Sequence, residues 1–169
     1  AITGKESREY KLTAKTKEQV RKQYLKRKQE GKRDNLLGKV IAVCTSERKG
    51  IQKTSVPEIK VIEDWGIEGD AHAGKWHRQV SLLSFDKIED FRARGAEVED
   101  GAFGENLVVQ GIDFATLPIG TKFQCNDVVL ELTQIGKECH SGCAIFKKMG
   151  ECIMPKQGVF TKVLHGGVI

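Results

Sequence analysis

The sequence predicts a mainly β domain, and three observations carry this prediction. At least six short segments rich in β-branched and apolar residues are separated by turn signals. The 18 glycines indicate many tight turns. The strand–helix alternation of a doubly wound sheet is absent. Many short strands with few helices favour a closed or partly closed β-barrel.

The expected elements follow one another closely. A helix is predicted over Phe85–Arg94, because Ser84 can cap its start and Gly95 its end. A second, short helix is predicted over 144–149. Strands are predicted at Gly38–Ser46, Glu58–Ile62, Gln79–Ser84, Glu105–Gln110, Lys122–Cys125, Val128–Thr133 and Val159–Leu164.

The charge is distributed unevenly along the chain. Residues 1–35 hold 12 Lys or Arg and 5 Asp or Glu, whereas 36–169 hold 16 basic and 18 acidic residues. We interpret 1–35 as a basic, helical N-terminal extension, with a linker as the alternative, and 36–169 as the folded domain. The slightly acidic domain argues against nucleic-acid binding, which needs a basic groove.

The sequence contains no membrane or export signal. No apolar run approaches the roughly 18 residues of a membrane span, and the N-terminus lacks an apolar signal-peptide core. We therefore expect a cytoplasmic protein with reduced thiols, some of them core residues. The missing initial Met is typical of a processed chain or a fragment. The five cysteines are Cys44, Cys125, Cys139, Cys143 and Cys152.

One cluster supplies the candidate catalytic residues, Lys137, Cys139, His140 and Cys143. A thiol is a nucleophile, sulfur carrier or metal ligand only as the thiolate. Lys137 and His140 are neighbours that can lower the pKa of Cys139, and Cys143 can act as a resolving thiol. Two structural cysteines in a turn are the alternative. A zinc site that also uses Cys152 is a weaker one, because adjacent Cys and His cannot easily reach one tetrahedral ion.

A glycine-rich loop and the start of the next strand form a second candidate site. Glycines let backbone N–H groups approach an anion, and His and Arg side chains bind phosphate or an oxometallate. A solvated surface turn is the alternative, and a metal site that includes His77 is weaker still. The candidate binding residues here are Gly69, Asp70, His72, Arg78 and Gln79.

A third candidate is the Glu105-Asn106 pair, which follows a tight turn at Gly101–Gly104. An acid and an amide at the mouth of a strand can orient a polar heterocycle. Stabilisation of the turn is the simpler interpretation of this pair taken alone.

These three segments, in this order and spacing, resemble the molybdenum-cofactor sulfurase C-terminal (MOSC) family. The resemblance implies a strongly twisted β-barrel similar to the small barrel domain of pyruvate kinase. It runs from about Gly38 to Val168, which is nearly all of the folded part. The matching segments are GIEGDAHAG (Gly66–Gly74), RQVSLLS (Arg78–Ser84), GAFGENLVVQGID (Gly101–Asp113), LPIGTKF (Leu117–Phe123), LELTQIGKEC (Leu130–Cys139) and VFTKVLHGG (Val159–Gly167).

The family likeness also implies roles for individual residues. Cys139 takes the position of the cysteine that carries sulfur as a persulfide or ligates molybdenum. The proposed pocket for the molybdenum cofactor is lined by Gly69, Asp70, His72, Glu105 and Asn106. The sequence departs from the family at Lys137 and Glu138, where many members have Arg and Pro. A Glu beside Cys139 tends to raise its pKa.

The leading hypothesis is a sulfur-carrier domain that handles the molybdenum cofactor. No pyridoxal-phosphate desulfurase site is seen in the sequence, so the sulfur would come from a separate cysteine desulfurase or other donor. The acceptor would be an enzyme of cofactor biosynthesis or one that uses the cofactor. The rival hypothesis is a non-catalytic module that binds a molybdenum-pterin or molybdate, with Cys139 as metal ligand. An oxidoreductase with a permanently bound cofactor is a third, weaker hypothesis.

Overall fold

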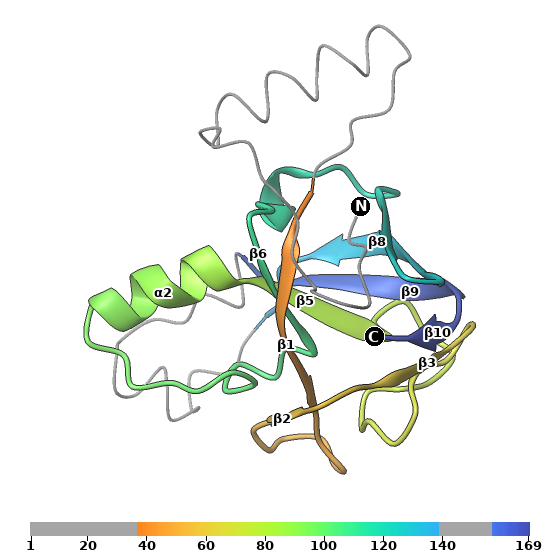
Figure 1. The fold of residues 1–169 in the computed structure, drawn as a ribbon, viewed down its shortest axis with the longest axis horizontal. Helices are drawn as coiled ribbons and strands as arrows, with labels where there is room; N and C mark the ends of the chain where they lie inside the picture. Colours follow the sequence, from red (N-terminus) through yellow and green to blue (C-terminus); the bar gives the residue numbers. More distant parts are fainter. Residues whose placement is uncertain (1–36, 139–156) are drawn as a thin grey trace, which may run out of the picture.

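The computed structural model describes residues 37–138 and 157–169, and its fold is mainly β, as predicted (Figure 1). Seven strands form one sheet in the order β2-β1-β6-β5-β9-β8-β7. The sheet curls into a half-barrel, helped by register shifts along β8 and β9. Its strands are β1 (Lys39–Thr45), β2 (Thr54–Val56), β5 (Val80–Ser84), β6 (Leu107–Gln110), β7 (Lys122–Cys125), β8 (Val128–Ile135) and β9 (Val159–His165).

A smaller sheet of three strands lies beside the half-barrel. Its strands are β3 (Lys60–Ile62), β4 (Gly66–Ile67) and β10 (Gly167–Val168), in the order β10-β3-β4. A 3₁₀ turn, η1 (Phe114–Thr116), precedes β7. None of the helices in the described ranges is long and apolar enough to cross a membrane.

The central strands bury both faces, which explains their nearly continuous apolar sequence. In β5, Leu82 belongs to the core inside the half-barrel, whereas Leu83 belongs to a second core under the helix. In β1, Val43 and Cys44 divide between the same two cores. A strand buried on both sides positions the loops at its ends firmly, because neither face can shift without opening a core.

The helix α2 (Phe85–Ala93) confirms the sequence prediction apart from its last residue. The Ser84 side chain accepts a hydrogen bond from the Lys87 N–H, and Gly95 follows the helix with a φ of +101°. Ile88 and Phe91 are fully buried against the outer face of the sheet. This helix connects β5 to β6, which pair in parallel.

The structure differs from the predicted elements in a few places. The strands β2, β4 and β10 were not predicted, because segments of two or three residues carry no readable alternation. The β5-α2-β6 crossover gives one parallel pair among otherwise antiparallel pairs. The predicted helix over 144–149 and the helical extension in 1–35 lie outside the described residues.

Asn106 joins three strands through its side chain and is fully buried. Its amide NH₂ donates to the Cys44 carbonyl at 3.0 Å. Its side-chain oxygen accepts from the Ser81 N–H at 3.0 Å and from the Ser81 hydroxyl at 3.2 Å. The Ser81 hydroxyl can also donate to the Gly104 carbonyl, but the buried Cys44 carbonyl and Ser81 N–H would each lose a hydrogen bond without the Asn106 side chain.

Replacing Asn106 with Ala should therefore lower the free energy of unfolding by about 2–4 kcal/mol. The loss reflects buried donors and acceptors of β1 and β5 left without a partner. Urea denaturation of N106A would measure it. Gln110→Ala, at the half-exposed end of the same strand, is the control and should cost much less. A similar small cost in both variants would contradict this role for Asn106.

Candidate functional site

A buried lysine lies at the centre of the candidate site. The Lys53 side chain is 1% exposed, and its Nζ has three partners. It lies 2.7 Å from Oδ1 of Asp70, 3.1 Å from Oγ of Ser46 and 2.9 Å from Nδ1 of His72. An ammonium group has three N–H donors, so Lys53 can satisfy all of them within this cluster.

Asp70 organises the glycine-rich loop from inside. Its carboxylate is fully buried and accepts from the Ser46 N–H through Oδ1 and from the His72 N–H through Oδ2, both at 3.1 Å. Gly69 precedes it with a φ of +79°, a conformation that favours glycine. The loop backbone also pairs with β1, because the Ala71 N–H donates to the Ser46 carbonyl. Asp70 thereby fixes where His72 lies.

His72 is the part of this cluster that reaches the surface. Its side chain is 32% exposed, and its ring stacks at an interplanar angle of 8° on Trp76. Burial, followed by the charge of Lys53, lowers the pKa of His72 to about 4 against the opposing effect of Asp70. The charges of Lys49 and Lys137 act in the same direction as Lys53. His72 is therefore neutral at physiological pH.

Trp76 holds two further cations on its ring. The Lys49 ammonium lies 4.8 Å and the Arg78 guanidinium 4.6 Å from the ring centroid. The indole N–H donates to the His72 carbonyl at 2.8 Å, which ties the ring to the loop. Arg78 also lies 5.5 Å from the Phe160 ring. Nε of Arg78 is buried and has no hydrogen-bond partner among the described residues.

The end of β8 approaches the same loop. The Thr133 hydroxyl donates to the His77 carbonyl, and the His77 ring lies 2.7 Å from the Gln134 side-chain oxygen. Lys137, two residues beyond β8, is close enough for its charge to act on His72. The charges of three lysines thus act on His72, and Arg78 lies on the ring of Trp76, which stacks on His72. We call this set the cationic face: Lys49, Lys53, Arg78 and Lys137.

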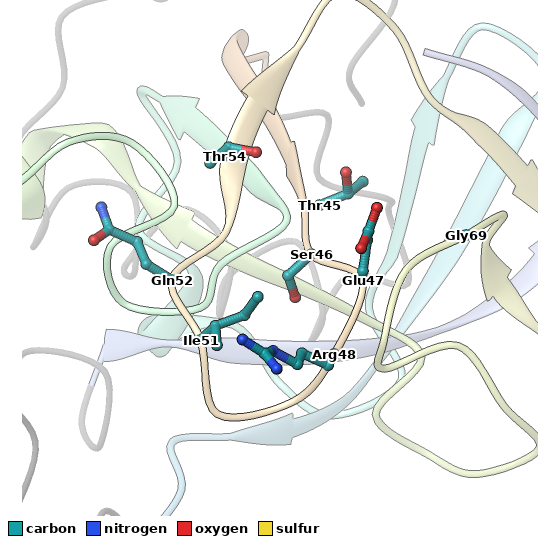
Figure 2. A pocket seen from close by; sticks show the side chains of 8 residues that line it. All are labelled: Thr45, Ser46, Glu47, Arg48, Ile51, Gln52, Thr54 and Gly69. Atoms are coloured by element: carbon teal, nitrogen blue, oxygen red, sulfur yellow. The ribbon is translucent and has the colours of Figure 1, made fainter.

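A pocket of about 600 Å³ opens beside the cluster (Figure 2). It lies between the β1–β2 hairpin loop and the loop that carries Gly69, and Ser46 forms part of its wall. Of the binding residues predicted from the sequence, only Gly69 lines it. The lining residues are Thr45, Ser46, Glu47, Arg48, Ile51, Gln52, Thr54 and Gly69.

Two predicted binding residues, Gln79 and Asn106, are fully buried in the fold. The Gln79 amide NH₂ donates to the Gly74 carbonyl at 3.0 Å and to Asp64 at 3.2 Å, and its oxygen accepts from the Val163 N–H at 2.9 Å. Gln79 therefore fastens the glycine-rich loop to β9, much as Asn106 fastens β5 to β1. Their contact with a ligand stays a prediction.

Glu105 is also fully buried, and no hydrogen bond to its carboxylate oxygens is formed among the described residues. Burial raises the pKa of Glu105 to about 8, although the nearby backbone N–H groups of Gly101 and Phe103 oppose the shift. Glu105 in turn acts on Cys44. Burial, then Glu105, raises the pKa of the Cys44 thiol to about 12.

Both cysteines in the described ranges, Cys44 and Cys125, are core residues. The sequence predicts this for some of the five cysteines. Cys44 is fully buried and Cys125 nearly so. The predicted catalytic residues Cys139, His140 and Cys143 lie outside the described residues, as does Cys152, so the zinc alternative stays untested. Within 37–138 and 157–169 no group of three His, Cys, Asp or Glu side chains could hold a metal, which gives the weaker metal site with His77 no support.

Three residues of this site were missed by sequence reasoning, namely Lys49, Lys53 and Trp76. Lys53 comes from the loop before β2, 17 residues before Asp70. A lysine in a hairpin loop is usually solvated, so its burial had no signal. Trp76 had a signal, because a large aromatic residue in a loop of glycines and charges needs a partner.

Comparison with known proteins agrees with this geometry. A family model of the MOSC domain matches residues 69–169. The chain belongs to the MOSC domain family. No curated protein matches the sequence. Domains of this family are linked to molybdenum-cofactor biology, and the matched segment includes Asp70, His72 and Arg78.

Solved structures show the same fold as this MOSC domain. YuaD from Bacillus subtilis has a TM-score of 0.62 and 16% identity, covering 78% of this chain and 90% of that one. YiiM from Geobacillus stearothermophilus has a TM-score of 0.59 and 19% identity, covering 78% and 70%. YiiM from Escherichia coli has a TM-score of 0.53 and 19% identity, covering 76% and 63%. The twisted, barrel-like fold predicted from the sequence is confirmed.

Glu105 should make the stability of the MOSC domain depend on pH. Its pKa is raised on folding, so above pH 4.5 the unfolded state loses a proton that the folded state keeps until about pH 8. Glu105 thus reduces stability by about 1.4 kcal/mol per pH unit as pH rises through this window. His72 acts in the opposite direction, but only between about pH 4 and 6.5.

The measurement is the free energy of unfolding between pH 6.5 and 8, where His72 no longer contributes. Glu105→Gln should flatten the decline, because an amide does not ionise. The exposed Glu99 supplies the control, and Glu99→Gln should leave the slope unchanged. An unchanged slope in Glu105→Gln would show that Glu105 is already ionised in the folded protein.

Proposed function

We propose that this MOSC domain is a sulfur carrier that handles the molybdenum cofactor, with a persulfide on Cys139. The observation that carries the proposal is the cationic face beside the chain that leads to Cys139. Lys137 acts electrostatically on His72, and only one residue separates it from Cys139. Cations near a thiol favour the thiolate, which is the reactive form.

The two described thiols support this assignment by elimination. The pKa of Cys44 is raised to about 12, so almost none of it is thiolate at neutral pH. Cys125 is buried among apolar side chains of the barrel core. A sulfur carrier in this chain would therefore use a cysteine of 139–152.

The transfer would proceed by thiol–persulfide exchange with a separate donor, such as a cysteine desulfurase. The Cys139 thiolate attacks the terminal sulfur of the donor's persulfide. A new S–S bond forms on Cys139, the donor's S–S bond breaks, and the donor leaves as a thiolate, with no net oxidation. At delivery, Cys143 would be the resolving thiol: its thiolate attacks Sγ of Cys139, a Cys139–Cys143 disulfide forms, and the outer sulfur leaves as hydrosulfide for an acceptor of the molybdenum-cofactor pathway. A thiol reductant would then return the disulfide to two thiols. In this role the domain acts as a sulfurtransferase that depends on its donor.

The residues of the cationic face also fit the molybdenum cofactor, which is a planar, phosphate-bearing group. Arg78 stacks on Trp76 and offers a buried N–H that lacks a partner among the described residues. No carboxylate pairs with Arg78 in the ranges described. Arg78 and Lys49 would hold the phosphate, and Cys139 the metal. When bound, the cofactor supplies a molybdenum centre that accepts sulfur or exchanges electrons.

This fit favours a second candidate function, a binding module that stores or delivers the cofactor with Cys139 as metal ligand. The specific observation behind it is the buried Nε–H of Arg78, which has no partner in the described ranges, because such a donor is costly unless another group satisfies it. The two candidates differ in what the protein carries after purification, sulfur in one case and molybdenum in the other.

The intact mass of the protein distinguishes them. After incubation with a cysteine desulfurase and cysteine, the protein should gain one sulfur that reductant removes. Cys139→Ser should abolish the gain, because the attacking thiolate is lost. Cys44→Ala is the matched control and should load normally. Loading that persists in Cys139→Ser would contradict the sulfur-carrier proposal.

The cofactor-binding candidate predicts an effect of Arg78. Arg78→Met should reduce the molybdopterin retained from a cofactor-producing host about tenfold, the effect of one charge-assisted hydrogen bond. Elemental molybdenum and pterin fluorescence would measure it. Arg94→Met, on the exposed end of α2, is the control. Equal retention in both variants, or no molybdenum in the unaltered protein, would count against binding.

A further inference from the structure

The Lys53–His72 contact determines which ring nitrogen of His72 carries the proton. Nδ1 of His72 lies 2.9 Å from Nζ of Lys53. An ammonium nitrogen only donates, so Nδ1 must be the acceptor. In a neutral imidazole the proton then resides on Nε2, and no described residue is a partner of Nε2. The Nε2–H of this partly exposed ring therefore has no acceptor among the described residues.

We propose that Lys53 is a positioning residue that holds His72 as the neutral Nε2–H tautomer, so that the cationic face offers an oxyanion a neutral hydrogen-bond donor. The proposal deepens the binding role proposed for this face and rests on it only for the identity of the oxyanion. His72 then serves as a donor that keeps its proton during binding, and it is not an acid at neutral pH.

The surroundings of Lys53 explain why this arrangement can persist. Nζ of Lys53 also donates hydrogen bonds to Asp70 and Ser46, so moving the ammonium group away from His72 would break both of them. Its backbone is fixed as well, because its N–H donates to the Gly101 carbonyl at 3.0 Å. A side chain at Gly101 would collide with the Lys53 backbone. Lys53 is therefore held at both ends.

The groups that face His72 come from three elements. Asp70 lies on the same loop, with Oδ2 at 4.0 Å from Nδ1. Lys53 and Lys49 come from the β1–β2 loop, and Lys137 follows β8. Asp70 alone favours protonation of His72, and the three lysines oppose it. Removing the Lys53 charge should therefore raise the pKa of His72, although burial still lowers it.

The first test needs no substitution. In ¹⁵N-labelled protein, long-range ¹H–¹⁵N spectra of the imidazole rings report the tautomer of each histidine. His72, assigned with His72→Gln, should show a pyrrole-type Nε2 and a pyridine-type Nδ1 from pH 5.5 to 8. A pyrrole-type Nδ1, or titration of His72 near pH 6.5, would overturn the proposal.

Two variants then separate the contributions of the neighbours. In Lys53→Met, His72 should titrate at a clearly higher pH than in the unaltered protein, because one of the groups that lower its pKa is gone. Asp70→Asn keeps the Lys53 contact and should preserve the Nε2–H tautomer without raising the titration midpoint. A midpoint that stays unchanged in a folded Lys53→Met protein would contradict the proposal. The measurement on unaltered protein remains decisive if that variant fails to fold.

Sulfate is a suitable probe of the binding consequence, because its charge is constant over this range. Its affinity, measured by shifts of the His72 and Trp76 side-chain signals, should vary less than twofold between pH 5.5 and 7.5. In Lys53→Met it should rise at least threefold toward pH 5.5, as His72 becomes a cation. A pH-dependent affinity in the unaltered protein would contradict the proposal. Failure of Cys139 to carry sulfur would leave these results untouched, so the two proposals can fail separately.

Discussion

The buried ion pair between Lys53 and Asp70 is the interaction on which the site depends. Nζ and Oδ1 lie 2.7 Å apart with both side chains removed from solvent. Burial of two charges is costly, so the pair is stable only because surrounding groups complete its hydrogen bonds. Ser46 supplies a backbone N–H and a hydroxyl, and His72 supplies an N–H and a ring nitrogen. From there, Trp76 is tied to the His72 carbonyl and holds Arg78 by stacking.

Much of the fold could be predicted because buried strands have a recognisable apolar sequence. β1 and β5 are apolar on both faces and read as buried strands, and the capped helix after β5 was found within one residue. The parallel pairing of β5 with β6 could not be predicted from the sequence. It depends on how the curled sheet closes, whereas the alternation of apolar and polar residues within one strand does not say which strand pairs with it.

The candidate site was predicted less completely, for a physical reason. Asp70, His72 and Arg78 stand close together in one segment, so their chemistry could be recognised together. Lys53 joins the site only through its contacts with Asp70 and His72, which are distant in the sequence and come together when the chain folds. Gln79 was expected at a ligand, yet its polar groups satisfy the backbone. A polar residue in an otherwise apolar strand is as consistent with such a structural hydrogen bond as with binding.

The domain contains two opposite environments for a thiol. Around Cys44, burial and the nearby Glu105 suppress ionisation, and the distant influence of Lys53 does not offset them. Around His72, burial and the charges of three lysines keep an imidazole neutral, and the positive potential of the lysines would stabilise a thiolate. An acid adjacent in sequence, Glu138, opposes this at Cys139, but a single exposed carboxylate is well screened by water. Under the sulfur-carrier proposal we therefore expect an ionised thiol at Cys139, two residues beyond Lys137 in the sequence.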